Sequence, residues 1–231
     1  MSSGWRNVAM ALAIAGLGGC GAGSRSQDGS SSAQGPQGAK IVQGEKQGPI
    51  YMIAQYDVED ITIRVPRELV VSEANSFRPD ADIVWRGEPI ADRYAQVEAI
   101  LTEAMVTGTA MMTSGPKVDI EITLARFHCL TERTRYSVGG VHAMQFDLTV
   151  RDADTGVIID GPRRVVADTK ASGGATAIAE DAAGQTQRVV VVDRLARAIR
   201  FALSRELPPS EGAALALAAE SATVTAPAPA F

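Results

Sequence analysis

Two stretches of alternating apolar and polar residues most limit what this chain can fold into. The alternating apolar positions of residues 118–124 are Val118, Ile120, Ile122 and Leu124. The positions that share one side of residues 142–150 are His142, Met144, Phe146, Leu148 and Val150. Because successive side chains of a β-strand point to opposite faces, each stretch predicts a strand with one buried face. The alternation slips near Arg126 and Phe127, which predicts a β-bulge at that point.

Shorter patterns complete an α+β fold. Strands are predicted at residues 61–71, broken by Pro66, at residues 81–86, and at residues 157–167 after a turn. Apolar residues recur every three or four positions in residues 90–112 and 186–207, the spacing of amphipathic helices. We therefore expect an antiparallel sheet of about four to five strands with both helices packed on one face.

The first 19 residues have the parts of an export signal. Arg6 is their only charged residue and precedes the apolar residues 8–17, which are too few to cross a bilayer. The following Leu17-Gly18-Gly19-Cys20 resembles the bacterial lipobox. This resemblance implies cleavage between Gly19 and Cys20 and attachment of a diacylglyceryl group, with acyl chains such as palmitate, to the Cys20 sulfur. A plain secretory signal with an incidental cysteine is the alternative.

Composition divides the rest of the chain. Residues 20–49 are rich in Gly, Ser and Gln and predict a flexible linker after the lipidated cysteine. Residues 50–207 form the predicted globular domain, and the Ala- and Pro-rich residues 208–231 predict a disordered tail. Under the lipobox resemblance, Gly21 in place of Asp favours the outer membrane, at its periplasmic face, over the inner membrane.

The two cysteines allow two interpretations. If Cys20 carries lipid, Cys129 has no partner and the exported domain is built without disulfides. The alternative is a Cys20–Cys129 bridge, which would tie the leader to a strand and close a loop of more than a hundred residues.

Charge and motifs narrow the functional classes. The net charge of −5 argues against nucleic-acid binding, which needs a dense basic surface. Neighbours on a strand point apart, so His128 and Cys129 make a poor metal pair. The sequence from Asp152 to Gly156 begins like a calcium loop, but Arg163 stands where that loop needs glutamate, and a hairpin turn is the better interpretation. We predict no catalytic residue, no metal site and no cofactor.

Two segments carry a family resemblance. Residues 82–104 (DIVWRGEPIADRYAQVEAILTEA) and residues 146–162 (FDLTVRDADTGVIIDGP) resemble a family of uncharacterised alphaproteobacterial lipoproteins. The strand, turn, strand and helix at the end of the chain are similar to envelope lipoprotein domains that act as assembly or auxiliary factors. Neither resemblance implies a catalytic residue.

The connection at residues 131–140 holds the candidate partner contacts. Arg133, Arg135 and Tyr136 combine cationic and aromatic side chains, which are enriched at binding hot spots. A solvated hairpin tip is the simpler interpretation of the same residues. We interpret the chain as a non-enzymatic, lipid-anchored periplasmic domain that binds an envelope protein. The alternative is a periplasmic small-ligand binder or an enzyme whose site is scattered along the sequence.

Overall fold

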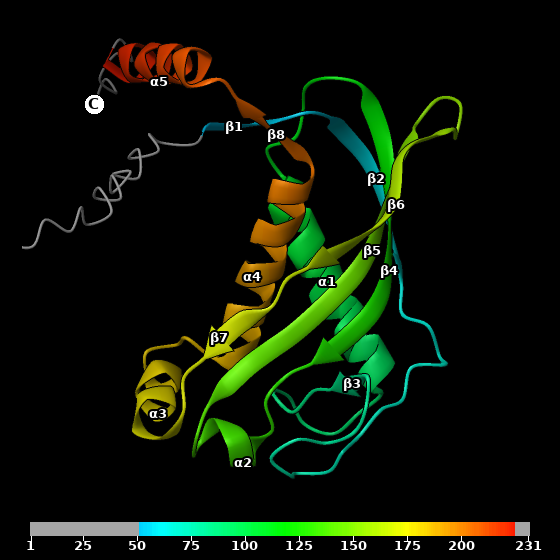
Figure 1. Ribbon diagram of the computed structural model, residues 1–231, viewed down its shortest axis with the longest axis vertical. Coiled ribbons are helices and arrows are strands. Elements are labelled where there is room, and N and C mark those ends of the chain that lie inside the picture. The colour runs from blue at the N-terminus through cyan, green and yellow to red at the C-terminus, as the bar shows by residue number, and fades with distance from the viewer. Residues whose placement is uncertain (1–50, 225–231) are drawn as a thin grey trace, which may run out of the picture. The chain divides into compact units, whose positions relative to one another are not determined.

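The computed structural model describes residues 51–224, with side chains to residue 217 (Figure 1). The predicted signal peptide, the lipid site Cys20 and the linker at residues 20–49 lie outside the described residues. In chain order the elements are β1 (Tyr51–Ala54), β2 (Asp57–Arg64), β3 (Ile83–Val84), α1 (Arg93–Thr109), β4 (Lys117–His128), α2 (Glu132–Arg135), β5 (Gly140–Asp152), β6 (Ile158–Val166), β7 (Thr169–Ala171), α3 (Gly174–Ala182), α4 (Gln187–Ala202), β8 (Ser204–Leu207) and α5 (Pro209–Val224).

The main sheet confirms the predicted α+β class. Its strand order is β2-β4-β5-β6, with β3 also paired to β4 and β7 to β5. The pairs β4–β5 and β5–β6 are antiparallel, as predicted. The strands β2 and β3 instead run parallel to β4, because α1 forms the crossover between them and β4. The sheet is therefore mixed rather than wholly antiparallel.

The predicted bulge lies one residue before the expected slip. Leu124 pairs with Phe146 and Arg126 with Gln145, so Ala125 is the extra residue of β4. Even-numbered side chains face the core as far as Leu124, and Phe127 faces it beyond the bulge. The residues that would have continued the buried face are thereby turned outward.

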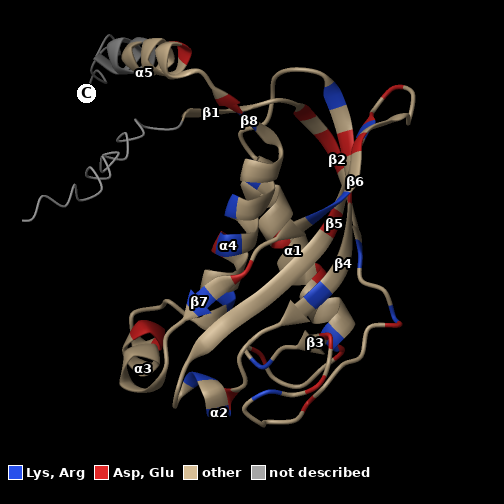
Figure 2. Ribbon diagram, in the orientation of Figure 1, with Lys and Arg blue, Asp and Glu red and all other residues tan. Residues whose placement is uncertain are grey.

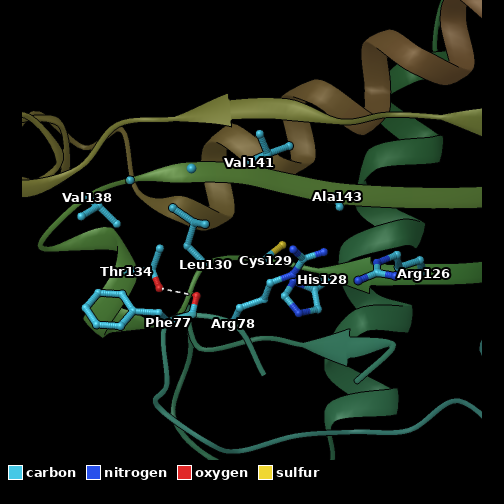
Figure 3. Close-up of a pocket in the computed structure, with 12 residues that line it drawn as sticks. Phe77, Arg78, Arg126, His128, Cys129, Leu130, Thr134, Val138, Val141 and Ala143 are labelled. Carbon is cyan, nitrogen blue, oxygen red and sulfur yellow. Dashed lines mark hydrogen bonds between the residues drawn. The ribbon is translucent and has the colours of Figure 1, made fainter. Parts of the chain in front are cut away.

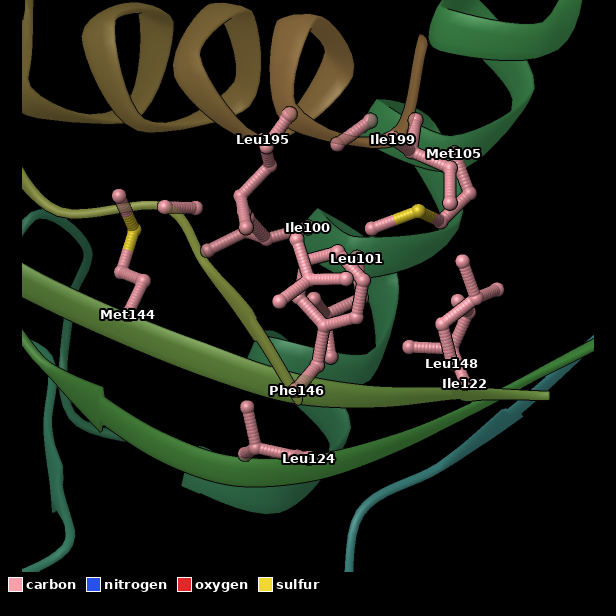
Figure 4. Close-up of a cluster of buried hydrophobic side chains, with 14 of the residues drawn as sticks. Ile100, Leu101, Met105, Ile122, Leu124, Met144, Phe146, Leu148, Leu195 and Ile199 are labelled. Atoms are coloured by element: carbon pink, nitrogen blue, oxygen red, sulfur yellow. The ribbon is translucent and has the colours of Figure 1, made fainter. Parts of the chain in front are cut away.

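The helices α1 and α4 cover one face of the sheet, as the sequence predicted (Figures 1 and 4). Figure 4 shows side chains of β4 and β5 pointing toward both helices. The fully buried members of this core include Ile100, Leu101, Met105, Ile122, Phe146, Leu148, Leu195 and Ile199. Burial of large aliphatic and aromatic side chains contributes about 1.5–3 kcal/mol each, so this layer provides most of the stabilisation.

Local capping sets where the two helices begin. The carboxylate of Asp92 accepts hydrogen bonds from the backbone N–H groups of Tyr94 and Ala95, at 3.0 and 3.3 Å. The Thr186 hydroxyl likewise accepts from the N–H of Val189. Because these side chains satisfy N–H groups that lack partners inside the helix, each helix starts directly after its cap.

The C-terminal part differs from the sequence expectation. The helix predicted to Leu207 ends at Ala202, because Ser204–Leu207 form β8 and pair antiparallel with β1. The helix α5 then occupies Pro209–Val224, where a disordered tail was predicted. Alanine and leucine are strong helix formers and proline is favoured at the first helical position, so composition alone allows this helix. A Cβ on Gly212 would lie 2.1 Å from the Tyr51 ring, so α5 packs closely on β1 there.

The helix α3 between β7 and α4 is absent from the elements that periodicity predicted. Its residues are mostly alanine and glycine and carry no clear apolar repeat. None of the helices among residues 51–224 is long and apolar enough to cross a membrane.

Gly108 lets α1 and α4 approach closely, so the change Gly108→Ala should destabilise the protein. The new Cβ would lie 2.3 Å from Cγ2 of Ile199 and 2.6 Å from the carbonyl oxygen of Ala196. We expect the free energy of unfolding to fall by about 1–3 kcal/mol, although alanine favours the helix. Urea unfolding measures the change.

The matched control is Thr107→Ala on the exposed side of the same helix, which should change stability by less than about 0.5 kcal/mol. An unchanged midpoint for Gly108→Ala would contradict the close helix contact.

Candidate ligand pocket

A pocket of about 380 Å³ lies where β4 ends and β5 begins (Figure 3). Its other walls come from the loop before β3 and from the connection between α2 and β5. The lining residues are Phe77, Arg78, Arg126, His128, Cys129, Leu130, Thr134, Val138, Gly139, Gly140, Val141 and Ala143. This volume lies within the range of small-molecule sites.

The bulge in β4 places the polar side chains of this pocket. Beyond Ala125 the alternation is reversed, so Arg126 and His128 leave the buried face that Phe127 enters. The imidazole Nε2 of His128 lies 2.9 Å from the carbonyl oxygen of Pro79, which ties the strand to the loop before β3.

Apolar side chains line much of the same pocket. Phe77, Val138 and Val141 are 55%, 74% and 48% exposed, although they are large and apolar. Leu130 and Ala143 lie between them in the lining. Exposed apolar side chains that gather around a hollow are typical of a binding site rather than of ordinary surface.

The charge in the pocket is cationic. Arg78 and Arg126 both line it, no acidic residue does, and neither arginine has a carboxylate partner in the described part of the chain. The Nε atom of Arg126 is buried and makes no hydrogen bond with the described residues. Because most buried polar atoms are hydrogen-bonded, this unpaired nitrogen marks a guanidinium whose donors the described residues leave unsatisfied.

The helix α2 fixes the outer wall. The hydroxyls of Thr131 and Thr134 donate to the carbonyl oxygens of Ser76 and Phe77, each at 2.8 Å. The guanidinium of Arg133 lies 4.9 Å from the centre of the Phe77 ring, a cation–π contact. The predicted contact residue Arg133 is therefore exposed at the rim of the pocket.

The other two predicted contact residues point elsewhere. The Arg135 side chain is 5% exposed and pairs with Asp181 of α3, Nη2 to Oδ1 at 2.7 Å. The Tyr136 hydroxyl donates to the same carboxylate at 3.1 Å, and Tyr136 is 49% exposed. Two helical positions rotate a side chain by about 200°, so Arg133 and Arg135 face opposite sides of α2. Arg135 is thus an internal link between α2 and α3, which the sequence did not reveal.

A second charged cluster holds the loop before β3. Arg93 is 4% exposed and donates to Glu73 through Nε at 2.6 Å and Nη2 at 2.9 Å. This hydrogen bond lowers the pKa of the Glu73 carboxyl. Arg86 bridges the same glutamate to Glu132 of α2. The irregular loop that supplies Phe77 and Arg78 is therefore fixed by ion pairs at its base.

The histidines and the described cysteine do not form a metal centre. β4 ends at His128, so Cys129 lies just beyond the strand, and residues 51–217 contain no group of three or more potential ligands. Burial raises the pKa of the Cys129 thiol well above its usual value, so it stays protonated.

Trp85 is fully buried, and its ring contacts the Phe127 ring edge to face, with 5.6 Å between the ring centroids.

His142 is a buried titratable group behind the pocket. Its Nδ1 accepts a hydrogen bond from the N–H of Leu130 at 3.3 Å, and its buried Nε2 has no partner among the described residues. Burial, and then the charge of Arg135, lower the pKa of His142 to about 4. The imidazole is therefore neutral at pH 7.

The shifted His142 pKa predicts a stability that falls on acidification. Between pH 6.5 and about 4 the unfolded chain binds a proton at His142 and the folded chain does not, so the free energy of unfolding falls as the pH is lowered. The loss of unfolding free energy caused by His142 reaches about 3 kcal/mol and does not increase further below about pH 4. Urea unfolding of wild type and His142→Asn from pH 7.5 to 4 should show a smaller slope in the variant.

The matched change Val141→Thr, at the exposed neighbouring position of β5, keeps both histidines and should keep the wild-type slope. Equal slopes for His142→Asn and wild type would show that His142 is not buried as a neutral group.

Comparisons with known proteins identify a family whose function is unknown. No curated protein matches this chain. A crystal structure described as that of a "putative lipoprotein" from Caulobacter crescentus CB15 matches with a TM-score of 0.28 and 16% identity, covering 61% of this chain and 86% of that chain. The model of DUF6778, a family of unknown function, matches residues 56–218, which include the pocket and the main sheet. The chain therefore belongs to the DUF6778 family.

Proposed function

We propose that this chain is a lipid-anchored protein of the bacterial envelope that binds an anionic ligand with an apolar part. The observation that carries the proposal is the pair of arginines without carboxylate partners, Arg78 and Arg126, in an apolar pocket that no acidic residue lines. A negative group would pair with guanidinium groups that lack a carboxylate, and an apolar group would cover the exposed Phe77 and Val138.

The pocket favours binding over catalysis. Acid–base chemistry needs a titratable pair within hydrogen-bond reach, and the described lining offers one histidine and two arginines without a carboxylate. The buried, protonated Cys129 is a poor nucleophile. A guanidinium, in contrast, is a permanent cation suited to carboxylate or phosphate recognition.

The anchor rests on the start of the chain. The lipobox-like residues ending at Cys20 support lipid attachment, and Gly21 favours the periplasmic face of the outer membrane. Cys129 is a free thiol that is 1% exposed, so it is not presented to a leader cysteine. Contact with an envelope protein stays a second proposal, with Arg133 and Tyr136 as its exposed candidate residues.

The change Arg126→Gln should weaken binding of a small anionic amphiphile. Octyl phosphate and octanoate provide the two anionic groups, while octanol and inorganic phosphate each lack one half of the proposed ligand. Isothermal titration calorimetry should show octyl phosphate or octanoate binding more tightly than either partial probe. Loss of one charged hydrogen bond should weaken that binding about 10- to 100-fold in Arg126→Gln.

Arg64→Gln is the matched control, because Arg64 is 64% exposed and paired with Glu121 outside the pocket. Its affinity should equal that of wild type. Octanol binding as tightly as octyl phosphate, or full affinity in Arg126→Gln, would overturn the assignment of the pocket.

Replacing Cys20 by serine tests the anchor separately. Serine has no thiol for the thioether, so Cys20→Ser should move the protein from the membrane fraction to the soluble periplasmic fraction. Cys129→Ala removes the other cysteine and should stay in the membrane fraction. Unchanged fractionation of Cys20→Ser would disprove lipid attachment at this residue.

A further inference from the structure

A second surface, on which exposed apolar side chains and arginines lie together, is found at the C-terminal end of α4. It surrounds a hollow of about 500 Å³, which β1, the end of α1 and the end of α4 line. We name it the Phe201 surface, and its defining residues are Met52, Ile53, Met111, Arg197, Arg200 and Phe201. The pocket described above lies near the other end of α4, where the Gln187 amide donates to the Leu130 carbonyl oxygen.

The apolar part of the Phe201 surface is unusually exposed. Met111 and Phe201 are 85% and 68% exposed, and Met52 and Ile53 are each more than a third exposed. Large apolar side chains that gather around one hollow mark a contact site with another apolar phase. Phenylalanine is among the side chains that interfacial segments bury in the acyl boundary of a bilayer, and methionine is a flexible apolar side chain that adapts to irregular surfaces.

The polar part of the Phe201 surface is cationic. Figure 2 shows basic segments along α4, and no acidic residue lines this hollow. The adjoining groove of about 720 Å³ shares Arg197 and Phe201 with it, and Arg163, Arg164 and Arg194 line the groove as well. On β8, Arg205 is exposed and lies directly opposite Ile53, while Glu206 lies opposite Met52 outside the hollow. The protein as a whole is acidic, so this concentration of arginines is local.

The contacts of Arg197 and Arg200 leave both available, whereas Arg163 and Arg164 of the groove are paired with Asp160 and Asp147. Arg197 pairs with Asp193 one turn earlier on α4, and both side chains are more than half exposed. Such an exposed pair contributes little, so the guanidinium can turn to a phosphate at small cost. Arg200 donates to the carbonyl oxygen of Gly108 at 3.4 Å and has no carboxylate partner among the described residues.

The chain enters the described structure at this same surface. The strand β1 begins at Tyr51 and contributes Met52 and Ile53, and it follows directly on the linker that the sequence places after Cys20. This inference rests on the proposed anchor at Cys20: a surface that adjoins the end of such a tether is held in the neighbourhood of lipid headgroups. The charge, the exposed apolar side chains and this position together favour a lipid surface over a protein.

We propose that the Phe201 surface docks on an anionic phospholipid bilayer, with Met111 and Phe201 entering the interface and Arg197 and Arg200 contacting lipid phosphates. The docking orients the protein on its membrane and is separate from ligand binding in the Arg126 pocket.

An environment-sensitive dye on a cysteine introduced at position 111 tests this orientation. The full chain carrying Met111→Cys is labelled with nitrobenzoxadiazole and added to vesicles of phosphatidylglycerol or of phosphatidylcholine, and vesicle-bound protein is isolated by flotation. We expect a blue shift on phosphatidylglycerol that is smaller or absent on phosphatidylcholine. Val157→Cys, at the exposed β5–β6 turn, is the matched label site and should not shift. The unsubstituted chain controls for label on its own cysteines.

The charge requirement is tested in the labelled protein. Arg197→Gln with Arg200→Gln should weaken the affinity for phosphatidylglycerol vesicles about 30-fold and so raise the phosphatidylglycerol content needed for half of the shift. Arg64→Gln with Arg67→Gln removes the same charge from exposed ion pairs elsewhere and should leave the shift unchanged.

Each result bears on the proposal. Vesicle-bound protein without a shift at position 111, or no flotation with phosphatidylglycerol, overturns it. Equal shifts at positions 111 and 157 would show contact without the stated orientation and overturn it too. A spectral change of the label at position 111 that requires a co-purifying protein and occurs without vesicles would assign the surface to a protein partner and overturn the proposal. The proposal for the Arg126 pocket is tested separately, because its ligand affinity is measured without vesicles.

Discussion

The extra residue in β4 determines which side chains of this strand face the core and which face the pocket. Up to Leu124 the strand gives its even-numbered side chains to the core, and beyond Ala125 it gives the odd-numbered ones. A regular strand would have directed Arg126 into the apolar layer under α1 and α4, where an unpaired guanidinium is very costly. The bulge therefore keeps the core apolar and at the same time creates a cationic wall on the other face.

The parts of the fold that depend on local periodicity were predictable. Alternation identified β4, β5 and the slip between them, and the 3.6-residue repeat identified α1 and α4. The parallel pairing of β2 was not visible, because it depends on where the crossover helix returns the chain. The strand β8 was hidden for a similar reason, since its partner β1 lies about 150 residues earlier and Ser204–Leu207 continue the apolar spacing of α4.

The pocket was harder to predict than the fold. Its two arginines come from a strand and from an irregular loop nearly fifty residues apart, and neither lies in a recognisable motif. The sequence did single out the segment that forms α2, as a candidate partner contact or a solvated hairpin tip. The structure shows Arg135 inside and Arg133 outside, because α2 is helical and turns them to opposite sides. The loop is instead held by ion pairs between Glu73 and two arginines beyond β3, Arg86 and Arg93, which no sequence spacing reveals.

The close contact of α1 and α4 at Gly108 holds α4 in place between the Phe201 surface and the Leu130 side of the pocket. The helix has 16 residues, which corresponds to about 24 Å, and Gln187 at its start bonds to the carbonyl of Leu130, a residue of the pocket wall. At physiological ionic strength the field of a charged bilayer decays over about 8 Å. With α4 upright on the bilayer, a molecule held against the Leu130 wall of the pocket would thus stand about 21 Å, between two and three decay lengths, from headgroups that touch Phe201, so their charge would alter its affinity little.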